Sequence, residues 1–229
     1  MVSLLNSAIK NNLKRIKFIR LLLYKIKSGY KKYQVFDFLS KDSIVIDIGA
    51  NIGEVSTYIN DKFGCQIYCY EPHPGAFKCL EKKFKKSKNI SIFNCAVSNQ
   101  NTEKNFYLHK ESPNENDLTY SQASSLEEKK ENISLEKRVI VKCIHINDIL
   151  KKFKKIDCIK IDIEGHEYKI IPFLIQNKSL IKKVICELHG SDSATSTNIK
   201  NAFLRPDYQS TISTLKEKKL YNNWFVEWI

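Results

Sequence analysis

Paired cysteines and long apolar runs are both missing from this sequence of 229 residues. The seven cysteines are odd in number, and no two of them form a CxxC pair, so neither a disulfide framework nor a zinc cluster is expected. Five of them lie in apolar, strand-like runs, where free cysteine behaves as a small hydrophobic residue: Cys69, Cys95, Cys143, Cys158 and Cys186. This usage is typical of a protein of the cell interior.

Membrane-spanning and secretory segments are not expected either. No apolar run approaches the ~18 residues that a transmembrane helix needs. The apolar residues near the start are interleaved with lysine and arginine and do not form the core of a signal peptide. The sequence therefore predicts a cytoplasmic protein, with attachment to a membrane surface as the alternative.

Acidic residues are absent from residues 1–36, which carry nine lysines and arginines. Apolar residues recur there at intervals of three and four, which predicts one long amphipathic helix. Two interpretations stay open: a helix packed on the domain, or an interfacial helix drawn to anionic lipid or polysaccharide. Aromatic residues are too sparse for a nucleic-acid module. We therefore expect a basic helical extension over 1–36 and one domain over 37–229.

From residue 43 onward, strand-like and helix-like patterns alternate. Strands are expected at 43–48, 66–70, 90–95, 139–144, 156–161 and 183–188. Helices are expected at 52–63, 74–84, 146–153 and 167–174. This alternation predicts an α/β fold, Rossmann-like, with an open and mostly parallel central sheet and helices on both faces. Ligands of such sheets bind beyond the carboxyl ends of the strands.

Two stretches break the alternation. Between residues 100 and 138 polar residues dominate, and we expect a short strand at 105–108, a long excursion and a short helix around 126–130. After a loop-like stretch at 190–208, a helix is expected at 209–219, and a strand-like end at 220–229 with a turn at Asn222-Asn223.

The loop after the first strand carries the strongest signal. Asp47 to Gly53 read D-x-G-x-N-x-G, whereas a dinucleotide site would have G-x-G-x-x-G. A strand, a glycine-containing turn and a helix start in this order can hold an anionic ligand group. Glu71 ends the next strand, 18 residues after Gly53, where a carboxylate can accept the two hydroxyls of a ribose. The alternative for Glu71 is a surface carboxylate that caps the helix near Pro74.

Three further segments follow the loop 47–53 and Glu71-Pro72: they are 94–98, Ser124-Ser125 and the K-I-D-x-E-G-x-E segment 160–167. Together these five segments resemble the FkbM family of S-adenosylmethionine-dependent methyltransferases over roughly residues 40–190. The resemblance implies a class I methyltransferase fold, S-adenosylmethionine as cofactor and methyl transfer to oxygen, often of a sugar or a polyketide.

The same resemblance implies residue roles. Asp47, Gly49, Ala50, Asn51 and Gly53 would surround the methionine part of the donor, and Glu71 with Pro72 would hold the ribose. Asn94, Cys95 and Ala96 would flank the adenine, Ser124 and Ser125 would close over the site, and Asp162 would line it.

A sugar hydroxyl needs a general base, and the candidates follow two strands. They are Asp162, Glu164 and His166 after one strand, and Glu187 and His189 after the next. Because strand residues alternate, Glu187 and His189 are expected on one face. We expect His189 or Asp162 as base, Glu187 as orienting residue, and His166 either in the site or on the following helix.

Other interpretations remain open around these residues. Glu164 and Glu167, near a helix start, can instead satisfy its first-turn donors. Asp162, Glu187 and His189 are plausible metal ligands, but their spacing does not require an ion, and no metal is predicted.

The acceptor is expected to be a small molecule or glycan with a free hydroxyl. The net charge of +13 raises RNA as an alternative acceptor, but no N-P-P-Y-like tetrapeptide follows a strand. A third hypothesis is a non-catalytic, membrane-docked subunit that binds the donor.

Overall fold

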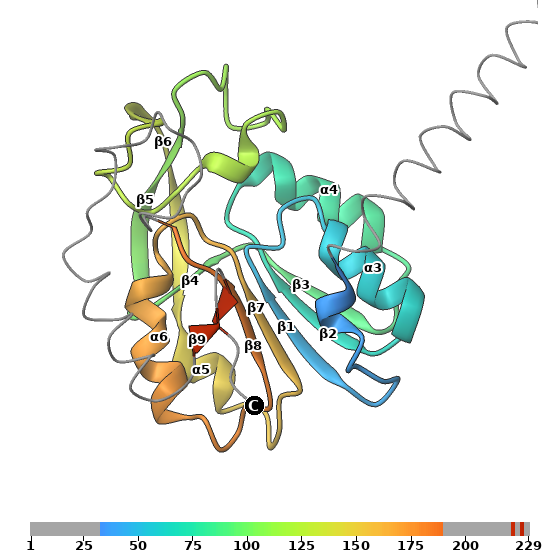
Figure 1. Cartoon of the computed structure of the whole chain (residues 1–229). Coiled ribbons are helices and arrows are strands. Elements are labelled where there is room, and N and C mark those ends of the chain that lie inside the picture. Colours follow the sequence, from blue (N-terminus) through green and yellow to red (C-terminus); the bar gives the residue numbers. More distant parts are fainter. Residues whose placement is uncertain (1–32, 190–220, 223–224, 227–229) are drawn as a thin grey trace, which may run out of the picture. The chain divides into compact units, whose positions relative to one another are not determined.

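The computed structural model describes residues 33–189, 221–222 and 225–226 (Figure 1). The chain divides into two units between residues 39 and 40. The described end of the first unit holds one 3-10 turn, η2 (Gln34–Phe36). The amphipathic helix expected over 1–36 lies otherwise outside the described residues, as do the loop at 190–208 and the helix at 209–219.

A seven-stranded sheet organises the second unit. Its order is β3-β2-β1-β7-β8-β10-β9. The strands are β1 (Ile44–Ile48), β2 (Gln66–Tyr70), β3 (Ile90–Phe93), β7 (Cys158–Ile161), β8 (Val184–Glu187), β9 (Tyr221–Asn222) and β10 (Phe225–Val226). The first five are parallel, whereas β10 runs antiparallel to both β8 and β9. The expected parallel sheet is thus confirmed. Of the strand-like end expected over 220–229, the described residues form β9 and β10, whereas Asn223 of the expected turn lies outside the described residues.

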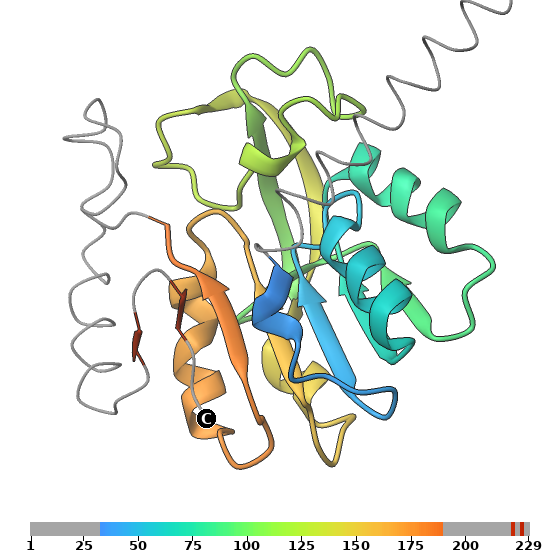
Figure 2. The same ribbon diagram turned by 45° about the vertical axis from the view of Figure 1, so that its right-hand side comes forward.

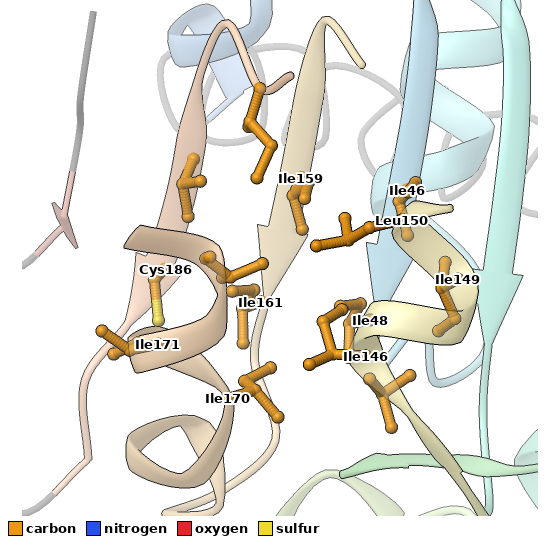
Figure 3. Packing of buried hydrophobic residues seen from close by; sticks show 14 of the residues in the cluster. Ile46, Ile48, Ile146, Ile149, Leu150, Ile159, Ile161, Ile170, Ile171 and Cys186 are labelled. Carbon is orange, nitrogen blue, oxygen red and sulfur yellow. The ribbon is translucent and has the colours of Figure 1, made fainter. Parts of the chain in front are cut away.

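Helices cover both faces of this sheet, as the alternation of strand residues requires (Figures 1 and 2). On one face, Ile46 and Ile48 of β1 pack in a cluster with apolar residues of α5 (Ile146–Leu150) and α6 (Glu167–Gln176), as Figure 3 shows. Between them in sequence, Asp47 points to the other face and bonds to Ser56 of α3 (Glu54–Phe63). The helix α4 (Pro74–Phe84) has the expected bounds.

A second, three-stranded sheet of order β4-β6-β5 corrects one expectation. It consists of β4 (Ala96–Ser98), β5 (Thr102–His109) and β6 (Ile133–His145). The segment 139–144, expected in the main sheet, lies in β6 instead. Its residues alternate between buried Val141 (7% exposed) and Ile140 (71% exposed), which is the pattern of a sheet with one face toward solvent.

The excursion between β5 and β6 contains one 3-10 turn, η3 (Ser121–Ala123). The helix expected around 126–130 was wrong, because that stretch is turn and irregular backbone. In the described part of the chain, no helix is both long enough and apolar enough to cross a membrane.

Candidate active site

The loop after β1 adopts backbone conformations that ordinary residues avoid. Gly49 and Gly53 both have φ of 77°, and Asn51 has φ of 47°. A Cβ at Gly49 would lie 1.9 Å from the carbonyl oxygen of Asp162, so only glycine fits there. The loop thereby folds tightly between the ends of β1 and β7 and leads into the N-terminus of α3.

Glu71 fastens this loop from the end of β2. The side chain is buried, and its two oxygens accept the backbone N–H groups of Asn51 and His73, each at 2.7 Å. Burial raises the pKa of Glu71 to about 7, although both hydrogen bonds act in the opposite direction. Glu71 therefore lies at the loop that it was expected to share with the donor.

Asp47 is fully buried below the loop. Its carboxylate accepts the Ser56 hydroxyl at 2.6 Å and lies 3.3 Å from the ammonium of Lys160. Lys160 also donates to the carbonyl oxygen of Gly49 at 2.7 Å. Although burial would lower the pKa of Lys160, the charges of Asp47 and Asp162 hold it above its ordinary value. The family resemblance implies no role for Lys160, although a lysine within the strand-like segment 156–161 indicates a buried charge that needs a partner.

The excursion contacts the loop after β1, and it contains Ser124 and Ser125, the two serines expected to close over the site. Ser121 in η3 accepts the side-chain amide of Asn51 at 2.9 Å, a contact that no local pattern predicts. Ser125 is fully buried and donates to the backbone carbonyl of Glu164 at 2.8 Å, so it fastens the excursion to the segment after β7. The buried Ser124 hydroxyl has no hydrogen-bond partner among the described residues.

The residues expected near the adenine lie beside the same strand ends. Asn94 is exposed and donates to the carbonyl oxygen of Glu71 at 3.0 Å. Cys95 belongs to the core of the main sheet, and Ala96 to the core of the second sheet. Pro72 is buried next to Glu71.

Three of the candidate general-base residues, Asp162, Glu164 and His189, converge beyond the ends of β7 and β8. The Nε2 atom of His189 lies 3.4 Å from Oε1 of Glu164 and 3.9 Å from Oδ1 of Asp162. The three side chains are 22%, 20% and 36% exposed, so the cluster is reachable from solvent. Asp162 connects it to the loop, because Lys160 lies 3.7 Å from Oδ2 of Asp162. The pairing of His189 with Asp162 was expected.

The residue that orients His189 is Glu167, and not Glu187 as expected. The buried carboxylate of Glu167 accepts the backbone N–H of His189 at 2.6 Å and lies 3.3 Å from Nδ1 of the ring. The Glu187 side chain is exposed at the end of β8. Burial alone would lower the pKa of His189, but the bonds and charges of Glu164 and Glu167 raise it to about 11.

His166 lies on the helix, the second of its two expected positions. It is the N-cap residue of α6 and is 3% exposed. Its ring nitrogens lie 2.9 Å from the Ser98 hydroxyl and 2.7 Å from Oε1 of Glu127. These contacts tie α6 to β4 and to the excursion, which is a structural role.

The residues at the strand ends fit the donor that the sequence resemblance implies. The left-handed loop and the start of α3 offer backbone donors to a carboxylate. Glu71 offers a carboxylate to hydroxyls, and the Ser124 hydroxyl is a buried polar group without a partner in the part of the chain that the structure describes.

Solved methyltransferase structures resemble the chain at low identity. One is precorrin-6y C5,15-methyltransferase from Geobacter metallireducens (12% identity, TM-score 0.39, 78% of this chain and 63% of that chain). Another is the N-terminal domain of human METTL16 in complex with SAH (11% identity, TM-score 0.41, 91% and 62%). A third is phosphoethanolamine N-methyltransferase 1 of Haemonchus contortus (12% identity, TM-score 0.41, 82% and 32%). The chain spans less than two thirds of each of these.

No curated protein matches the chain. A family model does: that of the methyltransferase FkbM domain matches residues 47–218, which is more than half of the chain. The matched range contains the loop after β1, Glu71, the excursion and the cluster around His189. The chain therefore belongs to the FkbM family of S-adenosylmethionine-dependent methyltransferases.

Proposed function

We propose that this methyltransferase acts on a hydroxyl oxygen of a sugar, a glycan or a related metabolite. The observation that carries the proposal is the position of Asp162. Its carboxylate is 36% exposed and pairs with Lys160. The same lysine donates to the Gly49 carbonyl in the loop after β1, where the donor is expected to bind. An acceptor bound at Asp162 would therefore lie next to the donor.

The chemistry asks little of the protein beyond positioning. When bound, S-adenosylmethionine supplies a methyl group on a sulfonium sulfur, which is already activated for transfer. The chain has two tasks: to hold the acceptor oxygen in line with that methyl group, and to remove the proton of the hydroxyl. In the proposed reaction the proton goes to the Asp162 carboxylate as the acceptor oxygen takes the methyl group.

Asp162 is preferred to His189 as the base on geometric grounds. Both ring nitrogens of His189 already face carboxylates, those of Glu164 and Asp162 on one side and that of Glu167 on the other. Asp162 is also the most exposed member of the cluster. A cluster of carboxylates offers several hydrogen-bond acceptors, which suits an acceptor molecule with several hydroxyl groups.

A methyl-transfer assay tests the proposal. The purified full-length chain is incubated with labelled donor and a panel of sugars, sugar nucleotides and RNA. We expect label on a sugar hydroxyl, and a loss of turnover of roughly 10²- to 10⁴-fold for Asp162→Asn with little change in donor affinity. Glu81→Gln, at an exposed carboxylate of α4, is the matched control and should leave turnover unchanged. Label on RNA alone would contradict the proposal and agree with the net charge of +13.

A further inference from the structure

Each member of the cluster around His189 has one atom held from outside and a second atom that faces the other members. Lys160 lies 3.7 Å from Oδ2 of Asp162, and Lys130 pairs with Oε2 of Glu164. Glu167 lies 3.3 Å from Nδ1 of His189. The remaining atoms are Oδ1 of Asp162, Oε1 of Glu164 and Nε2 of His189, and all three lie within 4.8 Å of one another.

The spacing of these three atoms is wider than that of the shortest charge-assisted hydrogen bonds, although Glu164 and His189 attract each other. A charge-assisted N–H···O bond is about 2.7–2.9 Å long. Here Nε2 of His189 lies 3.4 Å from Glu164 and 3.9 Å from Asp162. Neighbouring ligands of one cation, each bound at about 2.0–2.2 Å, are separated by about 3 Å or slightly more. The two distances from Nε2 of His189 exceed this spacing by less than 1 Å, so small side-chain movements would bring these atoms to the spacing of ligands around a shared cation.

The surroundings of His189 have the form that metal-ligating histidines usually have. Such histidines donate their second ring N–H to a carboxylate, which fixes the ring orientation. Glu167 is fully buried and faces Nδ1, and its second oxygen accepts the backbone N–H of Gly165 at 2.9 Å. Nε2 is thereby directed at the two carboxylates of the cluster.

The backbone of Glu164 also directs its side chain toward the centre. Its φ is 55°, a left-handed conformation that a residue with a Cβ rarely adopts. Ser125 holds it there by donating to the Glu164 carbonyl oxygen at 2.8 Å. Strained residues of this kind concentrate at functional sites.

We propose that Asp162, Glu164 and His189 bind a divalent cation. Two carboxylate oxygens and one imidazole nitrogen form a mixed donor set, which suits a cation such as Mn²⁺. No metal was predicted from the sequence, and among the plausible ligands named there the proposed set has Glu164 in place of Glu187, because the Glu187 side chain is exposed at the end of β8. Three protein ligands leave coordination positions open, and an acceptor hydroxyl bound there would be positioned beside the loop after β1. That role rests on the proposed function, whereas cation binding does not.

Binding of Mn²⁺ alone, without acceptor, tests the site. The full chain, first stripped with a chelator, is titrated with Mn²⁺ by calorimetry, and the bound ion is examined by pulsed electron paramagnetic resonance. We expect one site with the nitrogen coupling of a single imidazole. Asp162→Asn and Glu164→Gln should each weaken binding at least tenfold, and Glu167→Gln roughly 10- to 100-fold. Glu81→Gln should bind as the unchanged protein does.

His189→Gln should remove the nitrogen coupling, and each variant is compared by its melting temperature first. If His189→Gln does not fold, the two carboxylate variants decide the outcome. The proposal is overturned if the full chain binds no Mn²⁺ at millimolar concentration, or if folded Asp162→Asn and Glu164→Gln bind it unchanged. Because no acceptor is present, the result is independent of whether the methyl group goes to a sugar hydroxyl.

Discussion

Lys160 is 8% exposed and lies in a strand whose other members are all buried and apolar. A buried ammonium is costly unless it is paired, and Lys160 has Asp47 opposite it in the register of β1 and β7. Its donation to the Gly49 carbonyl places this ion pair directly under the loop after β1. Lys160 thus pairs with the Asp47 carboxylate and at the same time holds the backbone of the loop after β1 at Gly49.

We expect Lys160→Met to lower the free energy of unfolding by about 3–5 kcal/mol, because Asp47 would remain as an unpaired buried charge. Urea denaturation of the single and double variants measures this. The double variant Asp47→Asn with Lys160→Met should recover a large part of the loss, since no buried charge is then left alone. If the effects of the two substitutions simply add, the ion pair is not what stabilises this part of the fold.

Glu71 provides a second residue-level prediction, from its raised pKa. Glu71→Ala should weaken donor binding in calorimetry by well over tenfold, since the carboxylate would accept the ribose hydroxyls in addition to two backbone N–H groups. Only the ionised form can accept all of these donors. With a pKa of about 7, the affinity of the unchanged protein should rise from pH 6 to pH 8.

The same pKa has a consequence for stability without donor. Because it is higher in the folded chain than in the unfolded one, the folded state binds the proton more tightly. The contribution of Glu71 to folding is therefore largest at acidic pH and is lost as the pH rises through about 7.

The control for the pH dependence of donor binding is Glu71→Ala, whose donor affinity should lack the rise between pH 6 and pH 8. An equal rise in both proteins would assign the titration to another group.

Among the helices and strands, those bounded by prolines or other residues that end a strand or start a helix were predictable. The segments 66–70 and 74–84 have the observed bounds, because an apolar alternating run is followed by Pro72 and Pro74, which end the strand and start the helix. The pattern at 139–144 correctly predicted a strand but not its sheet. Alternation reports which residues face a core, and it contains no information on which strand is the neighbour.

The site was predictable to the same extent. Asp162 and His189 follow neighbouring strands, so their meeting could be inferred from the sheet. The role of Glu167 could not, because His189 lies beyond the end of β8, where the alternation of Glu187 and His189 no longer applies. The contact of Ser121 with Asn51 spans 70 residues and depends on how the excursion folds.

The excursion offers a matched pair of adjacent serines. Ser125→Ala removes the donor to the Glu164 carbonyl and the acceptor of the Glu127 N–H, both in a buried position. We expect a loss of about 1–3 kcal/mol in the free energy of unfolding, and faster amide hydrogen exchange at Glu164 to His166. Ser124→Ala removes a hydroxyl without a partner among the described residues, so stability should change little. If Ser124→Ala is the more damaging to stability, the excursion is held by other contacts.

For the whole molecule, the distribution of charge matters more than its sum. The chain carries a net charge of +13, and nine of its 38 lysines and arginines fall within residues 1–36, where no acidic residue balances them. A concentrated basic segment interleaved with apolar residues is the composition of an interfacial helix. The sheet and the active site lie outside this segment, so binding to an anionic surface and catalysis can be separated experimentally.

If residues 1–36 bind anionic lipid, the full chain should sediment with vesicles that contain phosphatidylserine and not with vesicles of phosphatidylcholine alone. Each lysine near such a surface contributes about 1 kcal/mol. Replacing Lys10, Lys14 and Lys17 by glutamine should therefore weaken binding by about two orders of magnitude at low salt, while the melting temperature stays the same. Raising the salt concentration should release the unchanged protein, because the attraction is screened within about 10 Å at 0.1 M. Equal sedimentation with both kinds of vesicle, or a lower melting temperature in the glutamine variant, would instead favour a helix that packs on the domain.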